Sequence, residues 1–131
     1  MMAEESILIV EDEALIAMEL EERLEILGYT NISRVFSGEE AVEKALEIHP
    51  RLIFMDISLS GKVNGLEASK AICSRLNIPV IYITGSSEKN LQNRLKEANF
   101  NHTYSYILKP FNEEQLEERI EAALGKRSPL K

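Results

Sequence analysis

Polar side chains stand at the ends of four short apolar runs in this sequence. They are Glu11 and Asp12, Asp56, Thr84 and Lys109. Each of these residues has an ordinary explanation by itself, because carboxylates and hydroxyls cap helices, aspartates occur in turns and lysines lie on surfaces. Three carboxylates, a hydroxyl and an ammonium gathered at one place would instead form a site for a cation and a phosphoryl group. The elements between these residues therefore decide what they can do.

Two kinds of segment alternate along the chain, and together they predict an α/β fold. Short apolar runs rich in β-branched residues predict strands at residues 6–10, 32–36, 51–56, 78–84 and 104–108. Each run is followed by a stretch with apolar residues three and four positions apart, which is typical of an amphipathic helix. Ser37 and Asn112 are expected to cap two of these helices, and Gly28 to end the first. The alternation predicts a doubly wound parallel sheet of five strands, because right-handed crossovers cover both faces with helices.

The composition fits a single globular domain. The chain has 131 residues, of which 44% are hydrophobic and 28% charged, a balance typical of folded domains. We expect one domain over residues 1–125 and a short flexible tail over residues 126–131. The net charge of −7 and the lack of a Lys/Arg block argue against direct nucleic-acid binding. No apolar run is long enough to cross a bilayer and the acidic N-terminus is unlike a signal peptide, so a cytoplasmic location is expected.

The single cysteine and the two histidines are expected to be structural. Cys73 lies in a helical pattern, where burial as a small hydrophobe is the expected role. His49 stands near a helix end, and His102 lies in a polar loop. The two histidines have no metal-ligand spacing, so both are expected at the surface.

Parallel strands would bring the polar side chains to one edge of the sheet. Ligands bind beyond the carboxyl ends of such strands, and neighbouring strands lie only about 5 Å apart. Glu11, Asp12 and Asp56 would repel one another there unless a cation lay between them. An all-oxygen donor set favours Mg²⁺ or Mn²⁺ over zinc. With Thr84 and Lys109 beside the ion, Asp56 would have the neighbours it needs to accept a phosphoryl group on its own oxygen.

The sequence resembles the receiver domain of two-component response regulators, from residue 7 to residue 124. The resemblance rests on five motifs in family order, namely ILIVEDE, LIFMDISL, GLEASKAI, IPVIYITG and YILKPF. It implies a (βα)5, flavodoxin-like fold with strand order 2-1-3-4-5, like that of the chemotaxis regulators. It also implies a single-domain response regulator, a signalling phosphoprotein of a phosphorelay rather than an enzyme that turns over an external substrate.

The resemblance also implies a role for each residue of the site. Asp56 would be the phosphoacceptor, and Thr84 and Lys109 would hold the phosphoryl group. The Mg²⁺ ligands would be Glu11, Asp12, Asp56 and the backbone carbonyl of Ser58. Tyr106 would be the switch aromatic, which turns inward when Thr84 moves. The peptide bond between Lys109 and Pro110 would be cis.

The partners implied by the resemblance are proteins. The phosphoryl donor would be a phosphohistidine on a histidine kinase or a histidine phosphotransfer protein. Phosphorylation would change how the face formed by the fourth helix, the fifth strand and the last helix binds a downstream target protein. The protein would be a monomer or a phosphorylation-dependent dimer.

Several positions depart from the common pattern of the family. Ser60 stands where the family often has proline, and Gly65 comes one residue later than usual. The segment 98–110 is a few residues longer than the usual connection. Tyr104 competes with Tyr106 as the switch aromatic, since both lie on one side of a regular strand and only the count back from the lysine favours Tyr106.

Three other readings compete with a phosphorylated receiver. Phosphatases of the haloacid dehalogenase type also use an aspartate after a strand, but they need a second aspartate two positions on, where this chain has Ser58. A flavodoxin-like flavin carrier would need a Ser/Thr/Gly-rich phosphate cradle after the first strand, and that turn is acidic. The third is a receiver-like module that binds partners without phosphorylation. By the resemblance to receiver domains, Ser58 and Ser86 stand where the family varies the residues that help or block the attacking water, and both are small hydroxyls here.

Overall fold

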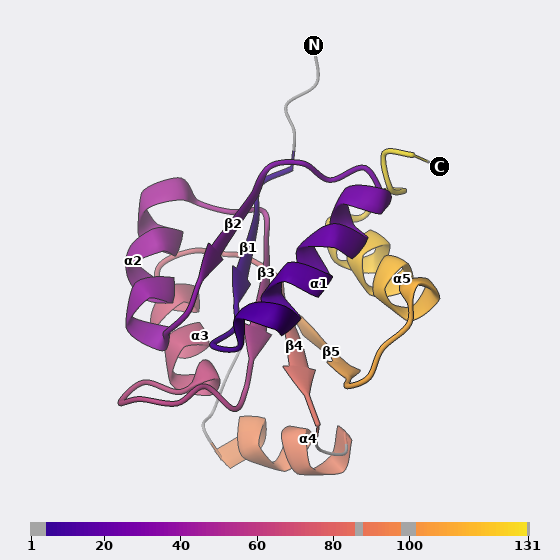
Figure 1. Ribbon diagram of the computed structural model, residues 1–131. Helices are drawn as coiled ribbons and strands as arrows, with labels where there is room; N and C mark the ends of the chain where they lie inside the picture. Colours follow the sequence, from indigo (N-terminus) through magenta and orange to yellow (C-terminus); the bar gives the residue numbers. More distant parts are fainter. Residues whose placement is uncertain (1–4, 86–87, 98–101, 131) are drawn as a thin grey trace.

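The computed structural model describes residues 5–85, 88–97 and 102–130, and these form five successive strand–helix units (Figure 1). The strands are β1 (Ile7–Val10), β2 (Ile32–Val35), β3 (Leu52–Asp56), β4 (Val80–Thr84) and β5 (Tyr104–Leu108). The helices are α1 (Ala14–Ile26), α2 (Gly38–Ile48), α3 (Gly65–Cys73), α4 (Glu88–Glu97) and α5 (Glu113–Leu124). The alternation predicted from the sequence is confirmed.

The strands form one parallel sheet in the order β2-β1-β3-β4-β5. The doubly wound, flavodoxin-like topology is therefore also confirmed. The fourth strand was expected to begin at residue 78 but begins at Val80. Pro79 directly precedes it and has no N–H to give to a neighbouring strand, although its carbonyl accepts a hydrogen bond from Ile53.

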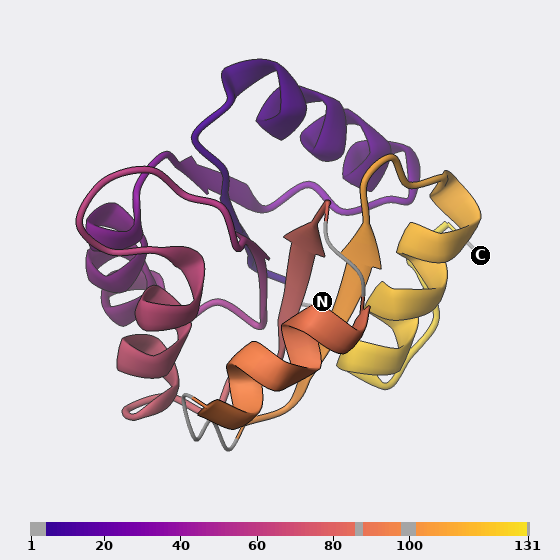
Figure 2. The ribbon, with the colours of Figure 1, turned by 90° about the horizontal axis from the view of Figure 1, so that it is seen from below.

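Helices cover both faces of the sheet, and alternate residues of each strand point to opposite layers. In Figure 1, α1 and α5 lie on one side of the sheet, with α2 and α3 on the other. From below, α4 lies between α3 and α5 (Figure 2). Leu95 of α4 packs in the same core cluster as Ala41 of α2 and Ile72 of α3. Leu20 of α1 and Ile120 of α5 pack in the opposite cluster.

Local sequence signals fix the helix ends. The side chain of Ser37 accepts a hydrogen bond from the N–H of Glu40, and that of Asn112 accepts one from Gln115, so the two predicted caps are confirmed. Asn64 caps α3 in the same way. Gly28 follows α1 with a φ of 101°, a conformation that costs glycine little.

The residues after α5 fold back toward α1. The N–H of Ser128 donates to a carboxylate oxygen of Glu121 at 2.9 Å, and the N–H of Leu130 donates to the carbonyl of Leu27 at 3.4 Å. A Cβ on Gly28 would lie 2.9 Å from Pro129, so the missing side chain leaves room for this segment. The flexibility of residues 126–131 stays a prediction. Within the described parts of the chain, no helix has the length and apolar character needed to span a membrane.

Candidate functional site

Three carboxylates meet at the carboxyl edge of the sheet. One oxygen each from Glu11, Asp12 and Asp56 lies within 4.8 Å of the others. The register explains this, because Val10 of β1 pairs with Met55 of β3 and the acidic residues come directly after each of them. Glu11 is 1% exposed and Asp56 is 2% exposed, whereas Asp12 is half-buried.

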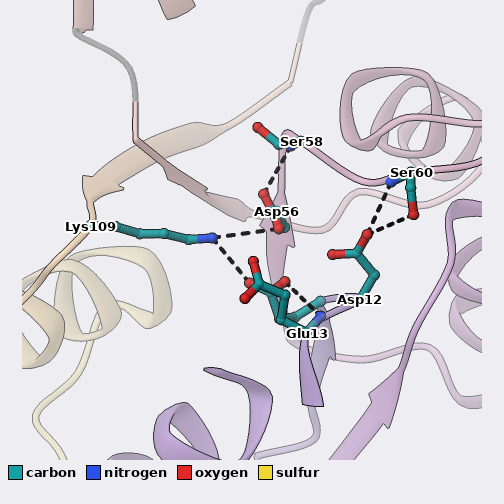
Figure 3. Close-up of polar contacts among 7 residues, drawn as sticks. Asp12, Glu13, Asp56, Ser58, Ser60 and Lys109 are labelled. Carbon is teal, nitrogen blue, oxygen red and sulfur yellow. Dashed lines mark hydrogen bonds and ion pairs between the residues drawn. The ribbon is translucent and has the colours of Figure 1, made fainter. Parts of the chain in front are cut away.

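Lys109 reaches these carboxylates from the last strand. Its Nζ lies 3.3 Å from Oε1 of Glu11 and 3.5 Å from Oδ2 of Asp56 (Figure 3). β5 is two strands away from β3, about 10 Å, so only a long side chain can span the gap. The N–H of Lys109 donates to the carbonyl of Thr84 at 2.9 Å, and the bond between Lys109 and Pro110 is cis. The ammonium is thus held over two buried acids.

Burial, hydrogen bonds and neighbouring charges shift the pKa values of Glu11, Asp12 and Lys109. Burial, together with a hydrogen bond to Asp56 and the charge of Asp56, raises the pKa of Glu11 to about 7. Burial alone would lower the pKa of Lys109, but the charges of Asp56 and Glu11 outweigh it and the pKa is raised. Partial burial disfavours the charged form of Asp12, yet hydrogen bonds from Ser60 prevail and lower its pKa. Lys109 therefore stays charged, and Glu11 holds its proton to a higher pH than an ordinary glutamate does.

Asp56 is fixed at both oxygens. The N–H of Ser58 donates to Oδ1 at 2.8 Å, and Oδ2 faces Lys109. Figure 3 shows the Asp56 carboxylate between these two groups. The carboxylate is therefore oriented before any ligand arrives. A role for the Ser58 backbone carbonyl as a metal ligand stays a prediction.

Thr84 lies at the same edge of the sheet, on the neighbouring strand. It is the last residue of β4 and is 2% exposed. Asp56 pairs with Ile83 and Thr84 pairs with Leu108, so Thr84 comes directly after the residue opposite Asp56. Its contact with a phosphoryl group stays a prediction. Ser86 lies outside the described residues.

The two tyrosines of β5 have different neighbours. Tyr106 pairs with Tyr82 in the sheet and packs, partly buried, against the core cluster that includes Tyr82. Tyr104 is 39% exposed, and its ring lies 6.0 Å from the ring of Tyr82 and 5.7 Å from that of His102. The structure thus separates the two candidates by environment, and the choice of Tyr106 as the switch aromatic stays a prediction.

His102 is more buried than the polar segment around it suggested. The hydroxyl of Tyr82 and Nε2 of His102 are 2.8 Å apart, and burial lowers the pKa of His102. No local pattern could reveal this pair, because the two residues are 20 positions apart and meet only in the folded chain. His49 ends α2 in a left-handed conformation with a φ of 47°.

Ser60 is a site residue that reasoning from the sequence missed. Its N–H and its hydroxyl both donate to Oδ2 of Asp12, at 3.1 and 2.8 Å. The sequence marked Ser60 only as a departure from a common proline. No local pattern could have revealed the contact, since the two residues are 48 positions apart.

The donor set fits a hard divalent cation. Three carboxylates share one small volume and face one ammonium, which leaves an excess of negative charge at buried positions. The three acidic side chains of this cluster offer oxygen atoms only, the ligand type that Mg²⁺ and Mn²⁺ prefer. The cluster therefore has the chemistry of a magnesium site.

Comparisons with known proteins agree with this arrangement. A family model for the response regulator receiver domain matches residues 7–121. The transcriptional regulatory protein PdtaR of Mycobacterium tuberculosis is 36% identical over 121 residues, which are 92% of this chain and 57% of the relative. The phyllosphere-induced regulator PhyR of Methylorubrum extorquens is 40% identical over 119 residues, which are 90% of this chain and 43% of the relative. The chain spans about half the length of these curated relatives.

Solved structures show the same fold. The signal receiver domain of a modulated diguanylate cyclase from Desulfovibrio desulfuricans G20 has a TM-score of 0.80 and 35% identity, covering 94% of this chain and 95% of its own. The receiver domain of a sensor histidine kinase from Pseudomonas aeruginosa PAO1, with a magnesium ion coordinated in its active-site cleft, has a TM-score of 0.81 and 26% identity, covering 95% of this chain and 100% of its own. From its sequence, its topology and its carboxylate cluster, the chain belongs to the response regulator receiver domain family.

Proposed function

We propose that this chain is a phosphorylation switch in which Asp56 accepts a phosphoryl group from a phosphohistidine. The observation that carries the proposal is the position of the Asp56 carboxylate, which is buried and held between the N–H of Ser58 and the ammonium of Lys109. The donor would be a histidine kinase or a histidine phosphotransfer protein. The bond from phosphorus to the donor nitrogen breaks as a bond from phosphorus to an Asp56 oxygen forms, and a proton replaces phosphorus on the imidazole.

Mg²⁺ is the proposed cofactor, with Mn²⁺ as a substitute. Glu11, Asp12 and Asp56 would hold it, together with the backbone carbonyl of Ser58. When bound, the ion neutralises charge on the phosphoryl oxygens. The chain's own groups do the rest: Lys109 neutralises phosphoryl charge from the other side, and the hydroxyl of Thr84 donates a hydrogen bond to the product.

The output is a change in partner binding. A phosphoryl group adds a charge of about −1.5 to −2 at an edge that Thr84 shares with Asp56. A shift of Thr84 toward that charge would draw its loop inward and let Tyr106 turn inward, which changes the face formed by α4, β5 and α5. The mechanism is a population shift between two packings of this face, and a downstream target protein or a second copy of the chain would read it.

A hollow beside the site could receive the donor protein. It has a volume of about 280 Å³ and is lined by Ile16, Glu19, Lys109, Pro110 and Phe111. Leu15 and Met18 of α1 are exposed large apolar side chains near it in sequence. Lys109 both lines this hollow and contacts Asp56, so a donor protein docked there would bring its phosphohistidine close to Asp56.

The role as a switch is favoured over that of a phosphatase. Ser58 stands two positions after Asp56, where a phosphatase of the haloacid dehalogenase type places an acidic proton donor, and the hydroxyl of serine is a far weaker acid. The protein would then assist its own phosphorylation and dephosphorylation without turning over an external ester. We place this function in the cytoplasm, where histidine kinases present their phosphohistidines.

The test is phosphorylation by a small acyl phosphate. The purified chain is incubated with acetyl phosphate and Mg²⁺, and intact-mass spectrometry is expected to show one added phosphoryl group. The addition should disappear with EDTA and in Asp56→Asn, and it should persist in Glu47→Gln, which changes an exposed carboxylate on α2. No added mass, or an addition that survives in Asp56→Asn, would refute the proposal.

A further inference from the structure

The three carboxylates of the site are anchored in two different ways. Glu11 accepts a hydrogen bond from the N–H of Glu13 at 3.1 Å, and Asp56 accepts one from the N–H of Ser58 at 2.8 Å. In both cases the donor lies two residues further along the same turn, so the anchor is local. Asp12 is held instead by Ser60, which lies 48 positions away in the loop between β3 and α3.

The anchor on Asp12 is double and falls on one oxygen. The N–H of Ser60 donates to Oδ2 at 3.1 Å, and its hydroxyl donates to the same atom at 2.8 Å. Figure 3 shows the loop of Ser60 lying against the side chain of Asp12. Neither contact uses Oδ1, so Ser60 restrains Asp12 through one oxygen only, as a group that orients a metal ligand does.

Asp12 needs such an anchor more than its neighbours do. Glu11 and Asp56 are almost fully buried and each also contacts Lys109. Asp12 is half-buried, lies beyond the end of β1 and has neither of these restraints. Without Ser60, the side chain of Asp12 could turn into solvent. Cation binding would then have to order this side chain, and the conformational entropy lost would weaken binding.

We infer that Ser60 is a positioning residue for the cation site, which it completes by holding Asp12 in place. The inference rests on the proposed function only in that the site binds Mg²⁺. The position of the loop between β3 and α3 and the binding of the cation are therefore coupled. A loop position that breaks the contacts of Ser60 lowers cation affinity. A bound cation in turn favours the loop position seen here. A proline at position 60, common in the family, would lack both donors.

A series of substitutions at this one position tests the inference. Ser60→Thr keeps both donors, Ser60→Ala keeps only the N–H, and Ser60→Pro removes both. Calorimetric titration of the phosphate-free protein with MgCl₂ should give affinities in the order wild type and Ser60→Thr, then Ser60→Ala, then Ser60→Pro. Loss of the hydroxyl should cost about tenfold, the lower end of the effects of groups that orient metal ligands, because this contact is exposed.

The control is a serine whose hydroxyl bond lies away from the site. Ser74→Ala removes a hydrogen bond of 2.8 Å to the carbonyl of Ala71 at the end of α3, and its Mg²⁺ affinity should equal that of the wild type. Thermal unfolding in EDTA shows that each variant is folded. Equal or tighter binding by Ser60→Ala, or equally weak binding by Ser60→Thr, would overturn the inference. A wild-type protein that binds no Mg²⁺ would instead overturn the proposed function.

Discussion

A side chain on Gly65 would collide with the carbonyl oxygen of Asp56, because a Cβ built on Gly65 lies 2.2 Å from that oxygen. The same Cβ would lie 2.9 Å from the Cα of Ile57. Gly65 is the first residue of α3, so the absence of its side chain lets the helix start directly against the turn that carries the site. The glycine that marked a departure in the sequence is therefore a point of close backbone approach.

Replacing Gly65 by alanine should destabilise the protein. The start of α3 and the turn at Asp56 and Ile57 must move apart to admit the methyl group. Overpacking of this kind costs about 1–3 kcal/mol of stability. Urea denaturation followed by circular dichroism would show the loss in the free energy of unfolding. Gly85→Ala is the matched control, since a Cβ there meets nothing within 4 Å. Equal stabilities of the two variants would contradict the prediction.

Lys109→Met should separate phosphorylation from cation binding. The ammonium contacts Glu11 and Asp56 at 3.3 and 3.5 Å, so it neutralises phosphoryl charge but competes with a cation for the same carboxylates. The rate of labelling by acetyl phosphate should fall about 100-fold, as expected for the loss of one charge-stabilising group. Mg²⁺ affinity measured by calorimetry should stay equal or rise.

The control for this variant is Lys44→Met, which removes an exposed ion pair with Glu47 on α2. It should leave both measurements unchanged. A variant at position 109 that lost Mg²⁺ binding but kept its labelling rate would show that the ammonium supports the cation site instead of the phosphoryl group.

Glu11→Gln should stabilise the cation-free protein in alkaline buffer. Burial, with help from Asp56, raises the pKa of Glu11 from 4.5 to about 7, so the folded state holds a proton more tightly than the unfolded state. The free energy of unfolding of the wild type must then fall as pH rises from about 4.5 to about 7 and stay low above that. Glutamine removes this fall, so the variant should gain up to about 3 kcal/mol at pH 8.

The gain is measured by urea denaturation in EDTA at pH 5 and pH 8, with Glu47→Gln as the exposed control. The difference between Glu11→Gln and the wild type should be larger at pH 8. A difference that grew toward acid would mean that Glu11 is stabilised as the anion, against the direction of its pKa shift.

Cys73 should react slowly while the protein is folded. Burial raises the pKa of its thiol from 9.0 to about 11, which lowers the thiolate fraction at pH 8 by about 100-fold, and the thiolate is the reactive form. Its Sγ also lies 3.7 Å from the carbonyl of Ile78. Iodoacetamide labelling followed by mass spectrometry should be at least about 100-fold slower in native buffer than in urea. Equal rates would show that the thiol is accessible and unperturbed.

Much of the fold follows from local sequence. Successive side chains of a strand point to opposite faces, which places Leu52 and Phe54 of the apolar strand β3 in one core cluster and Ile53 and Met55 in the other. Caps such as Ser37 and Asn112 set where helices begin. These signals involve neighbours on the chain, so they can be read without a structure. The rule that ligands meet the carboxyl ends of parallel strands then predicts that Glu11, Asp56 and Lys109 converge.

Contacts between loops are different, because nothing in the local pattern encodes them. The bond of Ser60 to Asp12 spans 48 positions, and that of Tyr82 to His102 spans 20. Each depends on how two connections are placed once the sheet has formed.

The strand–helix alternation, the parallel sheet and the charged residues at its edge can be predicted from short segments, since hydrophobic periodicity and strand ends are local properties. The oxygen of Asp12 that is held, the start of α3 against the carbonyl of Asp56, and the contact of Lys109 with Glu11 as well as Asp56 are set by the folding of the whole domain. The physical reason is that such contacts require positions good to a fraction of an ångström, and packing across the whole domain sets those positions.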